Sequence, residues 1–192
     1  TMLEDENMRL RRDAMLELVA MGRDAAPALI ALIGMVDDPG EDLDARRLSA
    51  RVLVRLAAQC EGADRRAAAL SLGRNLRDAD PLLRQLCREG LLELEHAASA
   101  AVPYLVDALK MRDPEERMEV IHVLGELGFY AKDALPALRE IADGGASEEV
   151  RRAAEQAARR IAKGRERPSP APRLESPKLD SIAMPPAGAR NE

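Results

Sequence analysis

The sequence has few aromatic residues and few cysteines. Only 2% of its 192 residues are aromatic, and none is tryptophan. A core must therefore be built from Leu, Val, Ile, Met and Ala, which suits closely spaced helices better than one thick globular core. The two cysteines, Cys60 and Cys87, match no metal or redox spacing. Two free thiols favour a reducing compartment, and we expect the protein to be cytoplasmic.

The sequence also shows no membrane-spanning or export signal. No apolar run approaches the roughly 20 residues of a membrane-spanning helix, and the start, TMLEDENMRL, is acidic where a secretory signal is basic and then apolar. We therefore expect no membrane insertion. The chain is 46% hydrophobic and 33% charged, with a net charge of −5. Its abundant Ala, Leu, Arg and Glu favour helix throughout.

Turn signals recur at short intervals along residues 4–163. We predict nine helices, and the turn signals between them include MGRD (21–24), DDPGED (37–42), CEGAD (60–64), RDADP (77–81), MRDP (111–114) and DGGAS (143–147). The last strong apolar positions of the first helices, Leu18, Leu56, Leu94, Leu127 and Ile161, are 38, 38, 33 and 34 residues apart. This period predicts an all-α fold: a right-handed superhelical solenoid of about four two-helix repeats with a C-terminal capping helix.

A proline recurs within one repeated phrase. The phrase occurs as RDAAPAL (23–29), SAAVPYL (99–105) and KDALPAL (132–138). We expect Pro27, Pro103 and Pro136 to lie in the first turn of the second helix of their repeats, where a backbone N–H has no intrahelical partner. The second repeat lacks this proline and is the least regular.

Three longer phrases carry a family resemblance. DPEERMEVIHVLGELG (113–128), KDALPALREIAD (132–143) and SEEVRRAAEQAARRI (147–161) resemble HEAT repeats, of the short bacterial type also found in phycobilin-lyase-like proteins. The resemblance covers about residues 8–163 and is strongest after residue 80. It implies an armadillo-like α-solenoid, a fold used by scaffolds, by adaptors and by a few enzymes.

Polar residues on the second helices are the candidate binding residues. In solenoids of this kind the second helices tend to line the concave face, which is the usual binding surface. We predict that a partner protein or peptide binds there, at Arg74, Asn75, Asp107, Lys110, Arg139, Glu140 and Asp143. The alternative is that these charges form ion pairs between repeats or a solvated face.

Catalytic and nucleic-acid-binding patterns are absent. His96 and His122 are far apart and form no metal-ligand pattern, so we expect no cofactor and no enzyme activity. Acidic residues stand beside most Arg pairs, so nucleic acid is not the expected partner. We predict a non-catalytic scaffold or adaptor. The alternative is a lyase-like or maturation accessory factor acting on a cofactor-bearing protein, in which Cys87 attaches a bilin, as the resemblance allows.

The composition changes after the last predicted helix. Residues 1–163 form the predicted solenoid, and residues 164–192 form a Pro-rich tail that we expect to be disordered. PSPAPR (168–173) suits a polyproline II helix, and PKLDSIAMPP (177–186) is an apolar patch flanked by prolines. Two interpretations of the tail remain open: one of these segments binds elsewhere, or the tail is a plain terminal extension.

Overall fold

The computed structural model describes residues 8–144 and 146–164, and these contain nine α-helices and four short 3-10 segments. Residues 1–7 and the predicted disordered tail lie outside the described residues. The α-helices are α1 (Met8–Met21), α2 (Leu29–Asp37), α3 (Leu43–Ala57), α4 (Gly62–Arg74), α5 (Pro81–Leu94), α6 (Val102–Ala108), α7 (Pro114–Leu127), α8 (Leu135–Asp143) and α9 (Glu148–Lys163). The 3-10 segments are η2 (Gly22–Ala28), η3 (Asn75–Arg77), η4 (Glu95–Ala101) and η5 (Gly128–Ala134).

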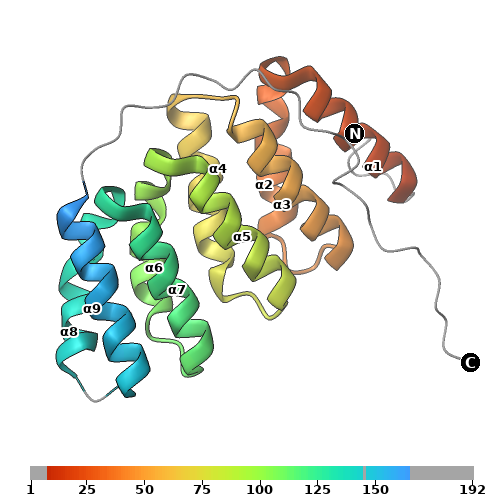
Figure 1. The fold of residues 1–192 in the computed structure, drawn as a ribbon. Helices are drawn as coiled ribbons and strands as arrows, with labels where there is room; N and C mark the ends of the chain where they lie inside the picture. The colour runs from red at the N-terminus through yellow and green to blue at the C-terminus, as the bar shows by residue number, and fades with distance from the viewer. Residues whose placement is uncertain (1–7, 145, 165–192) are drawn as a thin grey trace, which may run out of the picture.

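The helices stack in two layers that follow chain order (Figure 1). The first helices of the repeats, α1, α3, α5, α7 and α9, form the front layer of the view, and the second helices, α2, α4, α6 and α8, lie behind them. Each first helix packs against the next first helix. Helix α9 covers α7 and α8 with Val150, Ala154, Ala157 and Ile161. The predicted solenoid of four helix pairs and a capping helix is therefore confirmed.

Acidic or hydroxyl side chains begin the first helices at regular intervals. Asp42 caps α3, Asp80 caps α5, Asp113 caps α7 and Ser147 caps α9, each by accepting a hydrogen bond from a backbone N–H in the first turn. By their numbers these caps are 38, 33 and 34 residues apart. The period that the apolar positions predict is thus also the period of the helix starts.

Two of the three repeated prolines lie where the sequence predicts them. Pro103 and Pro136 occupy the second positions of α6 and α8, where a missing N–H breaks no helical hydrogen bond. The prediction for Pro27 is wrong, because this residue lies inside η2 and α2 begins only at Leu29.

The shifted position of Pro27 is clear when the prolines are counted from a backbone kink that the first, third and fourth repeats share. Gly22, Glu95 and Gly128 each have positive φ, at 60°, 48° and 55°, and each begins a seven-residue 3-10 segment. The second helix of the repeat starts directly after that segment. Counted from this kink, Pro27 stands three residues earlier than Pro103 and Pro136. The phrase RDAAPAL therefore aligns with KDALPAL by composition but not by structure.

Helices of neighbouring repeats approach most closely at glycine. A Cβ atom added to Gly90 of α5 would lie 2.4 Å from the Val54 side chain of α3. A Cβ atom on Gly73 of α4 would lie 2.9 Å from Ala101 Cβ. Both contacts are too short for any larger residue. The core around them is mostly Leu and Ala, as the lack of aromatic residues predicts.

One stretch, Leu10–Asp37, is long and apolar enough to cross a membrane by length and composition, contrary to the sequence expectation. The chain folds this stretch into two helices, α1 and α2, with η2 between them. Met15, Leu29 and Leu32 from the stretch are fully or almost fully buried in the core. Part of its apolar surface therefore packs within the solenoid, while Leu10, Met21 and Ile30 are exposed.

Ion pairs join successive first helices along the front layer. The inter-repeat pairs are Arg47–Asp80, Arg84–Glu116, Arg88–Glu119 and Arg160–Glu126, with N–O distances of 2.6, 2.5, 2.9 and 2.6 Å. Arg47 donates to both carboxylate oxygens of Asp80, at 3.0 and 2.6 Å. This bidentate hydrogen bonding lowers the pKa of the Asp80 carboxyl group.

The position of Pro136 predicts how a proline shift affects α8. We expect Pro136→Ala to change stability little, because the first turn needs no N–H at that position. Adding Leu138→Pro should lower the free energy of unfolding by about 3 kcal/mol or more, since Leu138 is fully buried in the body of α8. Urea unfolding of the single and double variants checks this. Equal midpoints would contradict the start of α8.

The Arg47–Asp80 pair predicts a pH-dependent stability. Because the pKa of Asp80 is lowered in the folded protein, the stabilisation is fully present above the unfolded-state pKa and is lost as the pH falls through the folded-state pKa. Asp80→Asn keeps a helix-capping oxygen but removes the charge. We expect it to cost about 1 kcal/mol near neutral pH, and the two proteins to converge in acid. Urea titrations from about pH 7 to pH 2 test this, and a pH-independent difference would argue against it.

Candidate functional site

The second helices of the first two repeats are joined through one carboxylate. Asp37, the last residue of α2, accepts hydrogen bonds from Ser71 Oγ and Asn75 Nδ2, both at 2.7 Å. It also accepts a bond from Arg74 Nε at 3.1 Å and pairs with the Arg74 Nη2 group. Two of the predicted binding residues, Arg74 and Asn75, therefore hold one repeat to the next.

A buried guanidinium extends this network to the turn between the second and third repeats. Arg46 of α3 donates twice to the Val36 carbonyl oxygen, at 3.1 and 3.0 Å, and once each to Asn75 Oδ1, at 3.1 Å, and Asp78 Oδ2, at 2.8 Å. Arg46 and Asn75 are only 6% and 7% exposed. Asn75 is thus inside the junction and not on the surface. Sequence analysis did not single out Arg46, Asp37 or Asp78.

A recurring signal could have revealed this network. An arginine stands four residues after each aspartate cap, as Asp42 and Arg46, Asp80 and Arg84, and Asp113 and Arg117. Arg84 donates to the carbonyl oxygens of Asp78 and Ala79, and Arg117 donates to that of Met111. Each arginine therefore binds backbone just before its own helix, near the end of the previous repeat.

Asp107 and Lys110 of the third repeat lie at the surface and interact with each other. The Asp107 carboxylate accepts from Lys110 Nζ at 3.1 Å and from Arg77 Nη1 at 2.8 Å. These hydrogen bonds, first that of Lys110 and then that of Arg77, lower the pKa of Asp107. The side chains of Asp107 and Lys110 remain well exposed, at 50% and 74%. This part of the predicted site is an exposed cluster of charges.

The last three predicted residues lie on α8. Arg139, Glu140 and Asp143 are all exposed, and among the described residues none of their side chains makes a hydrogen bond or an ion pair. The structure therefore divides the predicted site into a paired part at the first repeats and an unpaired part at the fourth.

Equivalent positions explain this division. Each repeat has a residue with positive φ, namely Gly22, Gly62, Glu95 and Gly128. The residues that stand at the same distance after these four are Asp37, Arg77, Lys110 and Asp143. Asp143 is thus the fourth-repeat counterpart of Asp37. Asp37 receives its donors from the second helix of the following repeat, whereas among the described residues no second helix follows α8.

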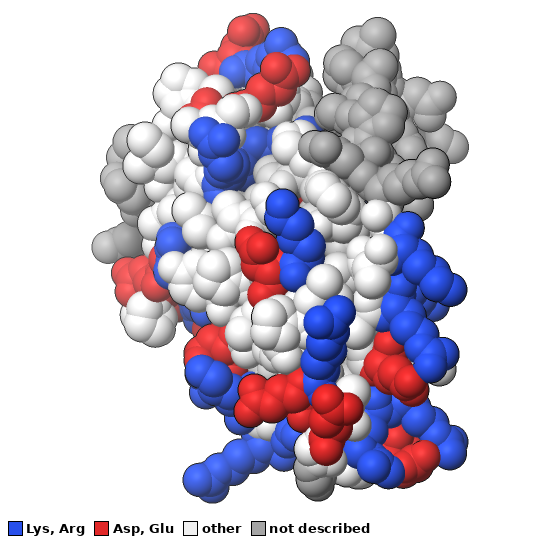
Figure 2. Space-filling view, turned by 90° about the vertical axis from the view of Figure 1, so that its left-hand side faces the viewer, with Lys and Arg blue, Asp and Glu red and all other residues white. Residues whose placement is uncertain are grey.

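The C-terminal end of the stack carries charges of both signs. Figure 2 shows this end, with Lys and Arg interspersed among Asp and Glu and with uncharged surface between them. On α9 the pairs Arg152–Glu148 and Arg159–Glu155 have N–O distances of 2.8 and 2.6 Å. The charges on this end therefore compensate one another locally instead of forming a field of one sign.

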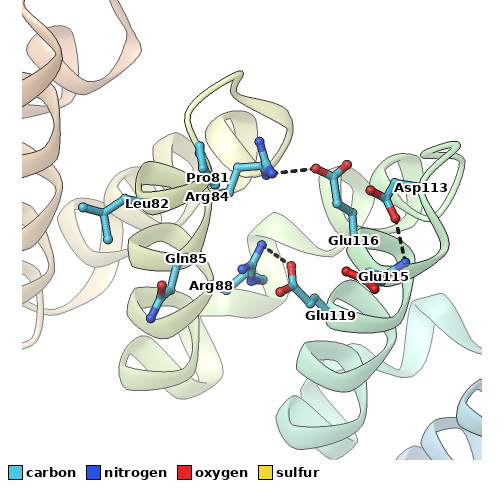
Figure 3. A pocket seen from close by; sticks show the side chains of 9 residues that line it. All are labelled: Pro81, Leu82, Arg84, Gln85, Arg88, Asp113, Glu115, Glu116 and Glu119. Atoms are coloured by element: carbon cyan, nitrogen blue, oxygen red, sulfur yellow. Dashed lines mark hydrogen bonds and ion pairs between the residues drawn. The ribbon is translucent and has the colours of Figure 1, made fainter.

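One open cleft, of about 460 Å³, lies between α5 and α7 in the layer of first helices (Figure 3). Arg84 and Arg88 of α5 face Glu116 and Glu119 of α7 across it. None of the predicted binding residues lines this cleft. Among the described residues no group of three His, Cys, Asp or Glu side chains is placed to hold a metal ion.

Cys87 is not placed for covalent attachment of a ligand. The residue is fully buried, and burial raises the pKa of its thiol to about 12. A thiol with this pKa holds almost no reactive thiolate near neutral pH. Burial also raises the pKa of the Cys60 thiol. The bilin attachment considered for Cys87 therefore has no support from this geometry.

The buried network predicts a large effect of Arg46. Arg46→Met should lower the free energy of unfolding by about 3 to 5 kcal/mol, because Asp78 and the Val36 carbonyl oxygen lose their buried partner. Arg139→Met is the matched control, and we expect it to change stability by less than about 0.5 kcal/mol. Urea unfolding of both variants provides the measurement. Similar stabilities for the two would remove Arg46 from its proposed structural role.

Comparisons with known proteins agree with this architecture. A protein-family model described as HEAT repeats matches residues 71–159. A search of curated proteins gives no significant match. Among solved structures, the crystal structure of an engineered protein, Northeast Structural Genomics Consortium target OR329, is similar with a TM-score of 0.52. The two chains are 19% identical, and the match covers 84% of this chain and 76% of the other.

At this identity, the likeness to the engineered protein shows the fold alone. The narrower resemblance to phycobilin-lyase-like proteins stays a prediction. The stacked helix pairs, their period and the family match lead to one conclusion: residues 71–159 match HEAT repeats, and the described residues form an α-solenoid of that kind.

Proposed function

We propose that this protein is a non-catalytic scaffold or adaptor that binds a partner protein or peptide along its second helices, at the third and fourth repeats. HEAT repeats generally serve in protein interactions, which supports the general class. The particular surface is supported by the contrast between the two ends of the stack. Charges at the first repeats are paired, whereas those on α8 have no partner among the residues that the structure describes.

Asp143 carries this proposal. Its counterpart Asp37 accepts hydrogen bonds from Ser71, Arg74 and Asn75 of the next second helix. A partner segment lying beside α8 can supply the same hydroxyl, amide and guanidinium donors to Asp143. Glu140 can accept further donors, and Arg139 can bind a carboxylate of the partner. The expected partner is therefore a polar, mixed-charge segment, and this surface needs no cofactor.

Aromatic and proline side chains add apolar contact area nearby. Tyr104 is 36% exposed, and Pro103 and Pro136 are exposed at the starts of α6 and α8. Tyrosine is enriched in the energetically important centres of protein interfaces. Asp107 and Lys110 lie on the same row of second helices as Glu140 and Asp143. The concave position of this row stays a prediction.

The alternative role as a lyase-like or maturation factor is not favoured by any feature of the described residues, and the buried thiol of Cys87 lends it no support. We also keep the cytoplasm as the predicted location, since Cys60 and Cys87 are free and buried thiols.

Charge reversal on α8 tests the proposed surface. The variant Arg139→Glu with Glu140→Arg and Asp143→Arg should lose a partner that wild-type protein captures from a lysate, by about tenfold or more, since each buried charge pair at an interface contributes 2 kcal/mol or more. Quantitative mass spectrometry of the captured proteins is the measurement.

The matched control changes the charge by the same amount on the first helices. It combines Arg55→Glu, Glu89→Arg and Glu93→Arg, all of which are exposed. The control should capture the partner as the wild type does. Equal capture by all three proteins would place recognition elsewhere and overturn the proposed surface.

A further inference from the structure

Three rings gather at one edge of the stack, where the 3-10 segments η4 and η5 meet. His96 of η4 lies 6.4 Å from Tyr130 of η5, centroid to centroid, and Phe129 lies 6.1 Å from Tyr130, both in edge-to-face geometry. His96 is exposed, and the other two rings are half-buried. We refer to His96, Phe129 and Tyr130 as the aromatic edge. It holds two of the three Phe and Tyr residues of a chain without tryptophan.

The chain leaves the solenoid at this edge. Helix α9 packs against η5, and Gly164, the last described residue, lies directly against Phe129. A Cβ atom on Gly164 would be 2.8 Å from the Phe129 backbone nitrogen. The next residues in the sequence are RER (165–167) and then PSPAP (168–172). The proline-rich segment therefore starts within a few residues of three rings.

We propose that the aromatic edge is a polyproline-binding site and that its occupant is residues 168–172 of the same chain. Proline-rich segments bind aromatic-lined surfaces as polyproline II helices, which lose little conformational entropy on binding. The site is separate from the surface of α8 proposed above, and either can fail without the other.

The dimensions of the edge and the segment agree. The two steps from Phe129 to Tyr130 and from Tyr130 to His96 together span at most about 12.5 Å. A polyproline II helix rises about 3.1 Å per residue, so Pro168 to Pro172 covers about 12 Å. The three residues between Gly164 and Pro168 are enough to bring the segment over the rings, because an extended residue spans about 3.3 Å.

Charge at the edge also suits this occupant. The Lys132 ammonium group lies 5.5 Å from the centroid of the Phe129 ring and is exposed. Glu166 stands two residues before the first proline. An approach of the Glu166 carboxylate to Lys132 would bring the prolines that follow towards Tyr130 and His96.

Trypsin offers a test with a matched bond inside the same tail. The bonds Arg173–Leu174 and Lys178–Leu179 both follow a proline and both precede a leucine. Arg173 directly follows the proposed bound segment, whereas Lys178 lies beyond it. In the full-length protein we expect cleavage after Arg173 to be about tenfold slower than after Lys178, because protease cuts only the undocked population. A synthetic peptide of residues 165–192 supplies the ratio of the two rates without the solenoid.

Two variants address the two sides of the contact. His96→Ala with Tyr130→Ala, in the full-length chain, should raise the rate after Arg173 to that seen in the free peptide. Pro170→Ala with Pro172→Ala, which leaves the trypsin-resistant Arg167–Pro168 bond in place, should do the same without touching the folded part, each rate being compared with that of a peptide carrying the same changes. His122→Ala, an exposed change on α7, should leave the protection unchanged.

The outcomes separate clearly. Protection in wild type that disappears in both the ring and the proline variants supports the proposal. A ratio of the two rates in wild type equal to the ratio in the free peptide overturns it, as does protection that survives replacement of the prolines. A protection lost only in the ring variant would show that the rings bind the tail by something other than proline, and this also overturns the assignment.

Discussion

The close approach of helix backbones at glycine is the constraint on which the stack depends. Gly90 leaves only enough room for the Val54 side chain, and Gly125 of α7 lies against Ala157 of α9, where a Cβ atom would be 3.3 Å away. A chain almost without aromatic residues has no large rings to fill wider gaps, so its helices must approach to the distance that Gly and Ala allow.

The same charge types then have two different roles. At the first junctions, Arg46, Asn75 and Asp37 satisfy one another in the interior, where an unpaired polar group is costly. On α8, Arg139 and Asp143 have solvent and no described partner. Nearest-neighbour packing produces this difference, because a position that contacts the following repeat has nothing to contact at the end of an array. The binding surface proposed for α8 is a consequence of that geometry.

Much of the fold could be predicted from the sequence. Local signals set the nine helices, and the spacing of apolar residues set the period, because both depend on residues near one another in the chain. The register of Pro27 could not be predicted in this way, since the proline phrase lies closer to the positive-φ residue in the first repeat than in the third and fourth, and the Ala-rich phrase reads alike in either register. The role of Asn75 was also out of reach, because its partners Arg46 and Asp37 are 29 and 38 residues away. The sequence feature that indicates this network is the recurring arginine four residues after each aspartate cap.

The cleft between α5 and α7 gives the array a mechanical asymmetry. The first two repeats are tied together by a network centred on the buried Arg46 and Asn75, whereas α5 and α7 face each other across an open cleft bridged by Arg84–Glu116 and Arg88–Glu119. Salt screens such partly exposed pairs, because the Debye length is about 10 Å at 0.1 M salt. We therefore expect the packing of α5 against α7 to depend on ionic strength more than that of the first two repeats, and with it the angle at which α8 meets whatever it binds.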